Sequence, residues 1–212
     1  VLENPQTELA TEILTADGKT LGSFFNDNRK PVKFDDLPTH LIDALVSTED
    51  ERFWDHSGID GYGTTRAVAY LGTAGGASTI TQQLAKLYFI GQGSSNKFER
   101  IIQKAREWII TSRLEKQYTK EEIITQYLNE FDFIFQAIGI RSASNIYFNK
   151  EPMQLSVSES AVLVAMLKNP RQFNPHREIS KEKSFNRRNQ VFFQMVRNGK
   201  MTEAVKDSLT AI

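Results

Sequence analysis

Residues 47–60 read STEDERFWDHSGID, in which three consecutive acids are followed at once by two large aromatics, a histidine and a glycine. On a helix that begins after Pro38, helical spacing places Glu49 on the apolar stripe formed by Ile42, Leu45, Val46 and Phe53. Apolar neighbours disfavour the charged form of a carboxylate, which is typical of a general acid or base that works near neutral pH. The alternative is structural: Glu49 pairs with an arginine such as Arg66 and only holds the helix in place.

The composition excludes several classes of protein. The chain has 212 residues, enough for one domain with a small lobe, and its 26 Lys and Arg balance 26 Asp and Glu, so its net charge predicts no nucleic-acid partner. It contains no cysteine, which excludes disulfides and thiolate metal sites, and His56 is expected to be a structural hydrogen-bonding residue rather than a zinc ligand. No apolar run is long enough to span a bilayer. We expect the chain to be an excised piece of a longer protein.

Most of the chain has helical patterning. Short alternating segments around Asp17-Gly18 predict a β-hairpin, so residues 1–35 are interpreted as a hairpin and a lead-in segment. After Pro38 the pattern becomes helical and mostly stays so. Later helices begin with capping boxes, in which a hydroxyl and an acid three residues on satisfy free amides, at Thr119 with Glu122 and at Ser156 with Glu159. The prediction is a mainly α fold, with a short N-terminal β-hairpin and a domain over residues 36–212.

A second informative stretch is GGASTITQQLAKLYF at residues 75–89. Helical spacing predicts an apolar face of Ile80, Leu84 and Leu87 and, opposite it, an exposed polar face of Thr79, Gln82, Gln83 and Lys86. The preceding glycines let a ligand approach the backbone closely, and a helix N-terminus favours anions. Together these features predict a face that binds sugar or phosphate. The alternative is that Thr79 and Gln82 form a capping box and the polar face is simply solvated.

A third stretch, KFERIIQKAREWII at residues 97–110, predicts two stripes on one helix. The buried stripe is expected to be Phe98, Ile101, Ala105 and Trp108, and the polar stripe is Lys97, Arg100, Lys104 and Glu107. Aligned cations can hold a pyrophosphate through charge-assisted hydrogen bonds, and they would keep Glu107 ionised. Two carboxylates in contrasting environments are typical of glycosyl-transfer chemistry. The alternative is an ordinary salt-bridged helix surface.

Taken together, these stretches resemble a known family. Five blocks occur in the family's order between about Asp36 and Arg177: EDERFWDHSGID, GASTITQQLAK, QKAREWIITSRLEKQYTKEEIITQYLN, AIGIRSASNIYFNK and LSVSESAVLVAMLKNPRQFNP. They are similar to the peptidoglycan glycosyltransferase domain of class A penicillin-binding proteins and monofunctional transglycosylases, glycosyltransferase family 51. Two departures are Leu87, where an asparagine often follows the motif lysine, and Asn149, which replaces the usual glycine of YFGK.

The resemblance implies a lysozyme-like helical lobe, a small flexible membrane-facing lobe at about residues 61–77, and a site in the cleft between them. It implies lipid II as the substrate. It carries the main catalytic role onto Glu49 and an assisting role onto Glu107. The positions it implies for substrate binding, together with Arg100 from the basic stripe, are Asp50, Phe53, His56, Ser78, Thr79, Gln82, Gln83, Lys86 and Lys104.

The implied reaction is an inverting displacement that forms β-1,4-linked glycan. Glu49 accepts the proton of a sugar 4-hydroxyl while that oxygen attacks the lipid-linked end of the growing chain. The leaving pyrophosphate needs charge neutralisation more than a proton, and the cations that would supply it are Lys104, Lys86 and Arg100. No cofactor is expected to be required, with a divalent Mg or Mn ion near Glu107 left open.

The resemblance also implies partners and a location. The expected partners are lipid II, the growing lipid-linked glycan chain, the membrane surface, a C-terminal transpeptidase domain and cell-wall synthesis proteins. The expected location is the outer, periplasmic face of the bacterial cytoplasmic membrane, with the native anchor outside this chain.

Two other classes of function remain open at this point. A lysozyme-like muramidase or lytic transglycosylase would also use a carboxylate in a helical cleft, but it would not need the basic stripe that ends in Glu107. A non-catalytic lipid II- or glycan-binding module would not need to retain both glutamates. Incubation with labelled lipid II distinguishes chain growth, cleavage and inert binding.

Overall fold

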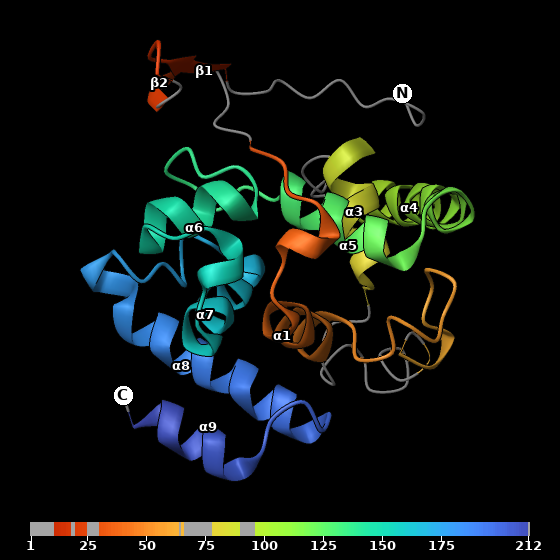
Figure 1. The fold of residues 1–212 in the computed structure, drawn as a ribbon. Coiled ribbons are helices and arrows are strands. Elements are labelled where there is room, and N and C mark those ends of the chain that lie inside the picture. The colour runs from red at the N-terminus through yellow and green to blue at the C-terminus, as the bar shows by residue number, and fades with distance from the viewer. Residues whose placement is uncertain are drawn as a thin grey trace.

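The computed structural model describes residues 11–17, 20–24, 30–63, 65, 78–89 and 96–211, and this part of the chain is mainly α-helical, as predicted (Figure 1). The predicted small lobe at about 61–77 lies outside the described residues except at 61–63 and 65. The elements in chain order are β1 (Thr11–Leu14), β2 (Thr20–Phe24), the 3₁₀ helix η1 (Phe34–Asp36), α1 (Thr39–Glu49), α3 (Ile80–Phe89), α4 (Lys97–Gln117), α5 (Lys120–Glu130), α6 (Ile140–Phe148), the 3₁₀ helix η2 (Pro152–Gln154), α7 (Val157–Lys168), α8 (Glu178–Arg197) and α9 (Glu203–Thr210).

The N-terminal strands pair with each other beside the helical body (Figure 1). β1 and β2 are antiparallel, with Thr11 opposite Phe24. A lead-in segment then joins the helices through Asn129 of α5. The Val32 N–H donates to Asn129 Oδ1 at 2.9 Å, and Asn129 Nδ2 donates to the Val32 carbonyl at 3.0 Å. This reciprocal pair fixes the segment that enters α1.

The helices share one hydrophobic core. α7 lies at its centre, because the stretch from Ser160 to Leu167 is buried on every side. α1 packs against α7 and α8, and α3 packs against α4 and α5. The two predicted capping boxes are present: the Glu122 N–H donates to Thr119 Oγ1 and the Glu159 N–H to Ser156 Oγ, each at 3.2 Å. Among the described residues, no helix is both long and apolar enough to cross a bilayer.

Two helix predictions need correction. α1 ends at Glu49, because Asp50 takes a non-helical conformation with φ −160° and ψ 75°. Phe53 is still fully buried, but it reaches the core from the turn that follows the helix.

The burial along α4 differs from that predicted. Ile101 is 68% exposed and Trp108 is 40% exposed, whereas Glu107 is only 8% exposed. Ala105 is also exposed. The reason is that α4 turns Lys104 and Glu107 towards α3, which supplies a partner for Lys104, whereas Arg100 stays exposed. Helical periodicity grouped these residues on one stripe but did not determine which of them face inward.

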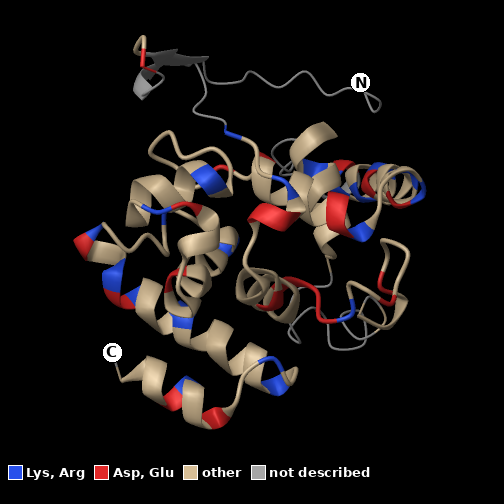
Figure 2. Cartoon of the chain, viewed as in Figure 1, with Lys and Arg blue, Asp and Glu red and all other residues tan. Residues whose placement is uncertain are grey.

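Charged side chains of both signs are interspersed over the helices, as the balanced composition predicts (Figure 2). Asn149 shows how one departure from the family pattern is accommodated. It ends α6 with φ 53° and ψ 43°, a left-handed conformation that glycine favours and that asparagine tolerates better than most residues. Asparagine is therefore compatible with the left-handed conformation that this position requires.

Candidate active site

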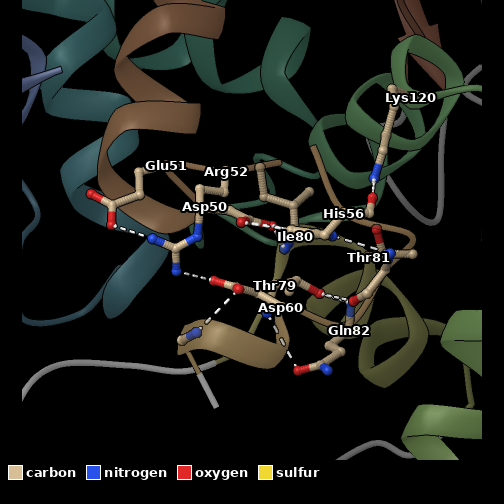
Figure 3. Close-up of polar contacts among 12 residues, drawn as sticks. Asp50, Glu51, Arg52, His56, Asp60, Thr79, Ile80, Thr81, Gln82 and Lys120 are labelled. Atoms are coloured by element: carbon tan, nitrogen blue, oxygen red, sulfur yellow. Dashed lines mark hydrogen bonds and ion pairs between the residues drawn. The ribbon is translucent and has the colours of Figure 1, made fainter. Parts of the chain in front are cut away.

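The site begins where α1 gives way to a turn, and Asp50 links that turn to α3 (Figure 3). The Ile80 N–H at the start of α3 donates to Asp50 Oδ2 at 3.0 Å, and His56 Nε2 lies 2.9 Å from Asp50 Oδ1. The Gly58 N–H donates to His56 Nδ1, so Nε2 carries the proton that is shared with Asp50. Because Asp50 directly follows Glu49, these bonds fix the position of Glu49 relative to α3.

The N-terminus of α3 is closed by a capping box. The Gln82 N–H donates to Thr79 Oγ1 at 3.1 Å, and the Thr79 N–H donates to Gln82 Oε1 at 3.3 Å. The Thr79 hydroxyl donates in turn to the Gly58 carbonyl at 2.6 Å. The prediction of an exposed polar face is therefore wrong for Gln82, which is 1% exposed, and Leu87, placed on the apolar face, is 42% exposed. The start of α3 is enclosed by the turn on one side and by α4 on the other.

Lys120, which sequence patterns did not single out, holds the turn against the helices. Its ammonium donates to the His56 carbonyl at 2.6 Å and to Glu115 Oε1 at 2.9 Å, and it lies 4.4 Å from the centre of the Phe53 ring. Gly58 has φ +85°, and a Cβ on it would lie 2.6 Å from a methyl group of Thr111. Only glycine fits there, so the glycine in the opening stretch is explained by close packing against α4.

A second acid–base pair stiffens the far end of the turn (Figure 3). Partial burial alone would raise the pKa of Asp60, but hydrogen bonds from the Arg52 guanidinium and the Gly63 N–H outweigh it and lower the pKa. Arg52 also donates to Glu51. The two acids beside Glu49 thus have structural partners. Asp50 accepts a hydrogen bond from the start of α3, and Glu51 forms ion pairs with Arg52 and Arg197.

Glu49 is half-buried and is held by neutral groups. Gln83 Nε2 donates to Glu49 Oε2 at 2.9 Å, and the Tyr127 hydroxyl donates to Gln83 Oε1 at 2.8 Å. Within the described part of the chain, Glu49 forms no ion pair. Burial, and after it the charge of Glu49, raise the pKa of the Tyr127 phenol well above its usual range. Gln83 contacts only Oε2 of Glu49, so Oε1 is left without a hydrogen bond to a described residue.

Glu107 is buried and is held by a cation. Lys104 Nζ pairs with Glu107 Oε1, and it also donates to Gln82 Oε1 at 3.3 Å and to Ser78 Oγ at 3.2 Å. Consecutive residues of α3 thus contact the two carboxylate sites, Gln83 contacting Glu49 directly and Gln82 reaching Glu107 through Lys104. Neighbouring residues on a helix point about 100° apart, so the glutamine pair serves two sites on two sides of α3.

The remaining predicted binding residues lie in different surroundings. Phe53 and Thr79 are buried, and Ser78 is exposed at the start of α3. Lys86 and Arg100 are exposed, and neither forms a hydrogen bond or ion pair with another described side chain. The roles of these residues in substrate binding stay predictions.

Comparisons with known proteins decide the family. The profile of the transglycosylase family matches residues 17–196. The chain belongs to this family. The transglycosylase domain is 41% identical over 189 residues to penicillin-binding protein 1A of Haemophilus influenzae. This alignment covers 87% of this chain and 21% of that protein. It is 34% identical over 206 residues to penicillin-binding protein 1A of Escherichia coli, in an alignment that covers 95% of this chain and 23% of that protein.

A solved structure has the same fold as this transglycosylase domain. The crystal structure of penicillin-binding protein 1A from Haemophilus influenzae matches with a TM-score of 0.52 and 24% identity, over 97% of this chain and 20% of that chain. The domain therefore spans about a fifth to a quarter of the length of these relatives. The resemblance that the five sequence blocks predicted is confirmed.

Proposed function

We propose that this domain is a peptidoglycan glycosyltransferase that polymerises lipid II into β-1,4-linked glycan strands. Glu49 serves as the general base, and Glu107 assists the departure of the lipid pyrophosphate. The observation that carries the proposal is the pair of consecutive glutamines on α3, which links one carboxylate held by neutral donors with another held by an ammonium group. An inverting displacement by a hydroxyl on a pyrophosphate-activated sugar needs these two environments.

Glu49 is suited to accept the proton of the attacking hydroxyl. Its Oε2 is held by Gln83, and its Oε1 has no hydrogen bond to any described residue. The acceptor sugar's 4-oxygen forms a bond to the anomeric carbon of the donor as its proton moves to Glu49. The bond from that carbon to the pyrophosphate oxygen breaks at the same time, with the electron pair leaving on the phosphate. The configuration inverts, so no covalent enzyme intermediate is needed.

Lys104 is suited to neutralise the leaving pyrophosphate. Its ammonium is held by Glu107, Gln82 and Ser78 at the N-terminal end of α3, and a preorganised charge stabilises a developing anion without reorganisation. Glu107 then assists by holding Lys104 in place. Lys86 and Arg100 are exposed, so both are free to turn towards a phosphate.

No resident cofactor is required by this scheme. Among the described residues, no group of three or more His, Cys, Asp or Glu side chains could hold a metal ion. Glu107 could hold Mg²⁺ or Mn²⁺ together with the substrate's phosphates, because Mg²⁺ is usually bound by one or two carboxylates plus phosphate oxygens. Such an ion would add positive charge at the leaving group, the contribution that Lys104 already makes.

The substrate determines where the domain works. Lipid II carries a long polyprenyl tail, so the site must open at a bilayer surface, which on this proposal is the outer, periplasmic face of the cytoplasmic membrane. The relatives are penicillin-binding proteins about four times as long as this chain. That length supports a transpeptidase domain in the full protein, and cell-wall synthesis proteins as partners.

Labelled lipid II in detergent tests the proposed function. Gel separation of the products should give a ladder of growing glycan, and finished glycan added to the same reaction should stay intact. Cleavage of finished glycan without chain growth would instead identify a muramidase or lytic transglycosylase. An inert chain that still retains lipid II would identify a binding module.

A further inference from the structure

Tyr127 lies on the buried face of α5, and its hydroxyl points at the site rather than at solvent. It is 1% exposed, and the neighbouring Ile123, Ile124 and Leu128 are fully buried. A buried phenol needs a hydrogen-bond partner, and the partner here is Gln83 Oε1 on α3, at 2.8 Å. The other end of the same amide donates to Glu49 at 2.9 Å. A continuous chain of hydrogen bonds therefore joins α5, α3 and the last residue of α1.

The chemistry of the three groups sets the direction of this chain. An ionised carboxylate only accepts hydrogen bonds, so the amide must present Nε2 to Glu49 and Oε1 to Tyr127. A phenol can satisfy Oε1 only by donating its proton. Burial and the charge of Glu49 both raise the pKa of the phenol, so it keeps that proton. With the amide turned round, its oxygen would face the carboxylate and repel it.

We propose that Tyr127 is a positioning residue for the general base: its hydroxyl locks the Gln83 amide in the orientation that donates to Glu49 and aims its carboxylate at the acceptor. The inference rests on the proposed role of Glu49. Without the hydroxyl, the Gln83 amide can rotate, and Glu49 loses the donor that fixes its second oxygen. Misplacing a reacting group reduces turnover steeply, while distant binding contacts to the substrate are unchanged. The effect should therefore fall on kcat and leave KM nearly constant.

Tyr127→Phe tests this, because it removes the hydroxyl and leaves the ring in the core. In the lipid II polymerisation assay, we expect kcat to fall about ten- to a hundredfold, with KM changed by less than about threefold. Tyr147→Phe is the matched control. Tyr147 is also buried, and its hydroxyl donates to the Phe133 carbonyl at 2.7 Å and accepts from Asn174 at 2.8 Å, away from Glu49. It should lower thermal stability at unchanged kcat.

Two further variants separate positioning from packing. With 4-fluorophenylalanine at position 127, fluorine fills the space of the hydroxyl but does not donate, so kcat should fall as in Tyr127→Phe. If Tyr127→Phe does not fold, the kcat of this variant measures the loss of the donor instead. With 4-aminophenylalanine, the ring and a donor are both kept, and kcat should return to within about threefold of the parent.

A double-mutant cycle tests whether Tyr127 acts through Gln83. In a Gln83→Met background the amide is already absent, so adding Tyr127→Phe should reduce kcat by less than about twofold further. Additive losses would overturn the inference, as would a Tyr127→Phe enzyme with the parent's kcat or one whose loss lies wholly in KM. A parent domain that makes no glycan at all would instead overturn the proposed function.

Discussion

Glu49 and Glu107 are two carboxylates that contact one helix through neighbouring side chains, yet their partners differ in charge. Glu49 receives a hydrogen bond from a neutral amide, which a neutral phenol supports. Glu107 is more deeply buried and faces the ammonium of Lys104. A neighbouring cation stabilises the ionised form of a carboxylate, and a neutral donor does so less strongly. Glu49 is thus left with one oxygen that contacts no described residue, whereas Glu107 holds a cation.

Two consecutive glutamines on α3 give Glu49 and Glu107 their different surroundings. Gln82 and Gln83 are chemically identical, and helix geometry alone gives them different neighbours. Gln82 closes the N-terminus of α3 and accepts from Lys104, whereas Gln83 faces α1 and α5. Changes on one side of α3 should therefore alter proton transfer, and changes on the other side should alter the handling of pyrophosphate.

The largest expected effect is at Glu49. Glu49→Gln keeps the size of the side chain but cannot accept a proton, so polymerisation should fall by about a thousandfold or more. Circular dichroism and thermal unfolding should match the parent, because Gln83 can still bond to the new amide. If the variant polymerises lipid II within about tenfold of the parent, the general base lies elsewhere.

Lys104→Ala should have the next largest effect. Removing the ammonium takes away the charge that meets the pyrophosphate and leaves Glu107 buried without its counter-ion, so turnover should fall about a hundredfold. Neutral sugar fragments that lack pyrophosphate should bind equally well to variant and parent. An equal loss of affinity for both kinds of ligand would mean that Lys104 only supports the fold.

Exchanging the glutamines one at a time tests the two sides of α3 directly. Gln83→Glu would place a second carboxylate about 3 Å from Glu49, where the two like charges repel each other and Glu49 loses the amide that holds it. Gln82→Glu would place the same charge beside Lys104 and the N-terminus of α3, where it is favourable. At pH 7, Gln83→Glu should be at least about tenfold slower than Gln82→Glu. Equal rates in the two variants would show that Gln83 and Gln82 do not serve separate carboxylate sites.

Much of this architecture could be predicted from sequence because it depends on neighbours along the chain. The capping boxes at Thr119 and Ser156 bond residues three positions apart, and both were predicted. By contrast, the inward face of α4 depends on the partner that α3 supplies to Lys104, which no local pattern specifies.

Two further features could not be predicted, for the same reason. The burial of Tyr127 follows from helical spacing, but its partner Gln83 lies 44 residues earlier in the chain. The loop after α5 has positive φ angles of 60°, 53° and 61° at Ile134, Phe135 and Gln136, although none is a glycine. Left-handed backbone in a β-branched residue has no local signal, because the surrounding structure imposes it.

The smallest expected effect is on stability, and it concerns a carboxylate that supports the fold rather than the site. Glu159, in the first turn of α7, accepts hydrogen bonds from the Ser156 N–H at 2.8 Å and from Lys150 at 2.8 Å. Partial burial alone would raise its pKa, but the bonds from Lys150 and Ser156 outweigh burial and lower the pKa. The stabilisation is therefore present above the unfolded-state pKa of about 4.3 and is lost as pH falls through the lower folded-state value.

Glu159→Gln should accordingly lower the free energy of unfolding at pH 7 by about 1 kcal/mol, and the deficit should shrink below about pH 4. Glu182→Gln, at an exposed position of α8, is the control and should change stability by less than about 0.5 kcal/mol. Denaturant unfolding at several pH values measures both. At temperatures where Glu159→Gln is folded, its polymerisation rate at pH 7 should equal the parent's, because Glu159 contacts Ser156 and Lys150 and neither Glu49 nor Lys104. A slower rate in the folded variant would show that Glu159 also acts on the site.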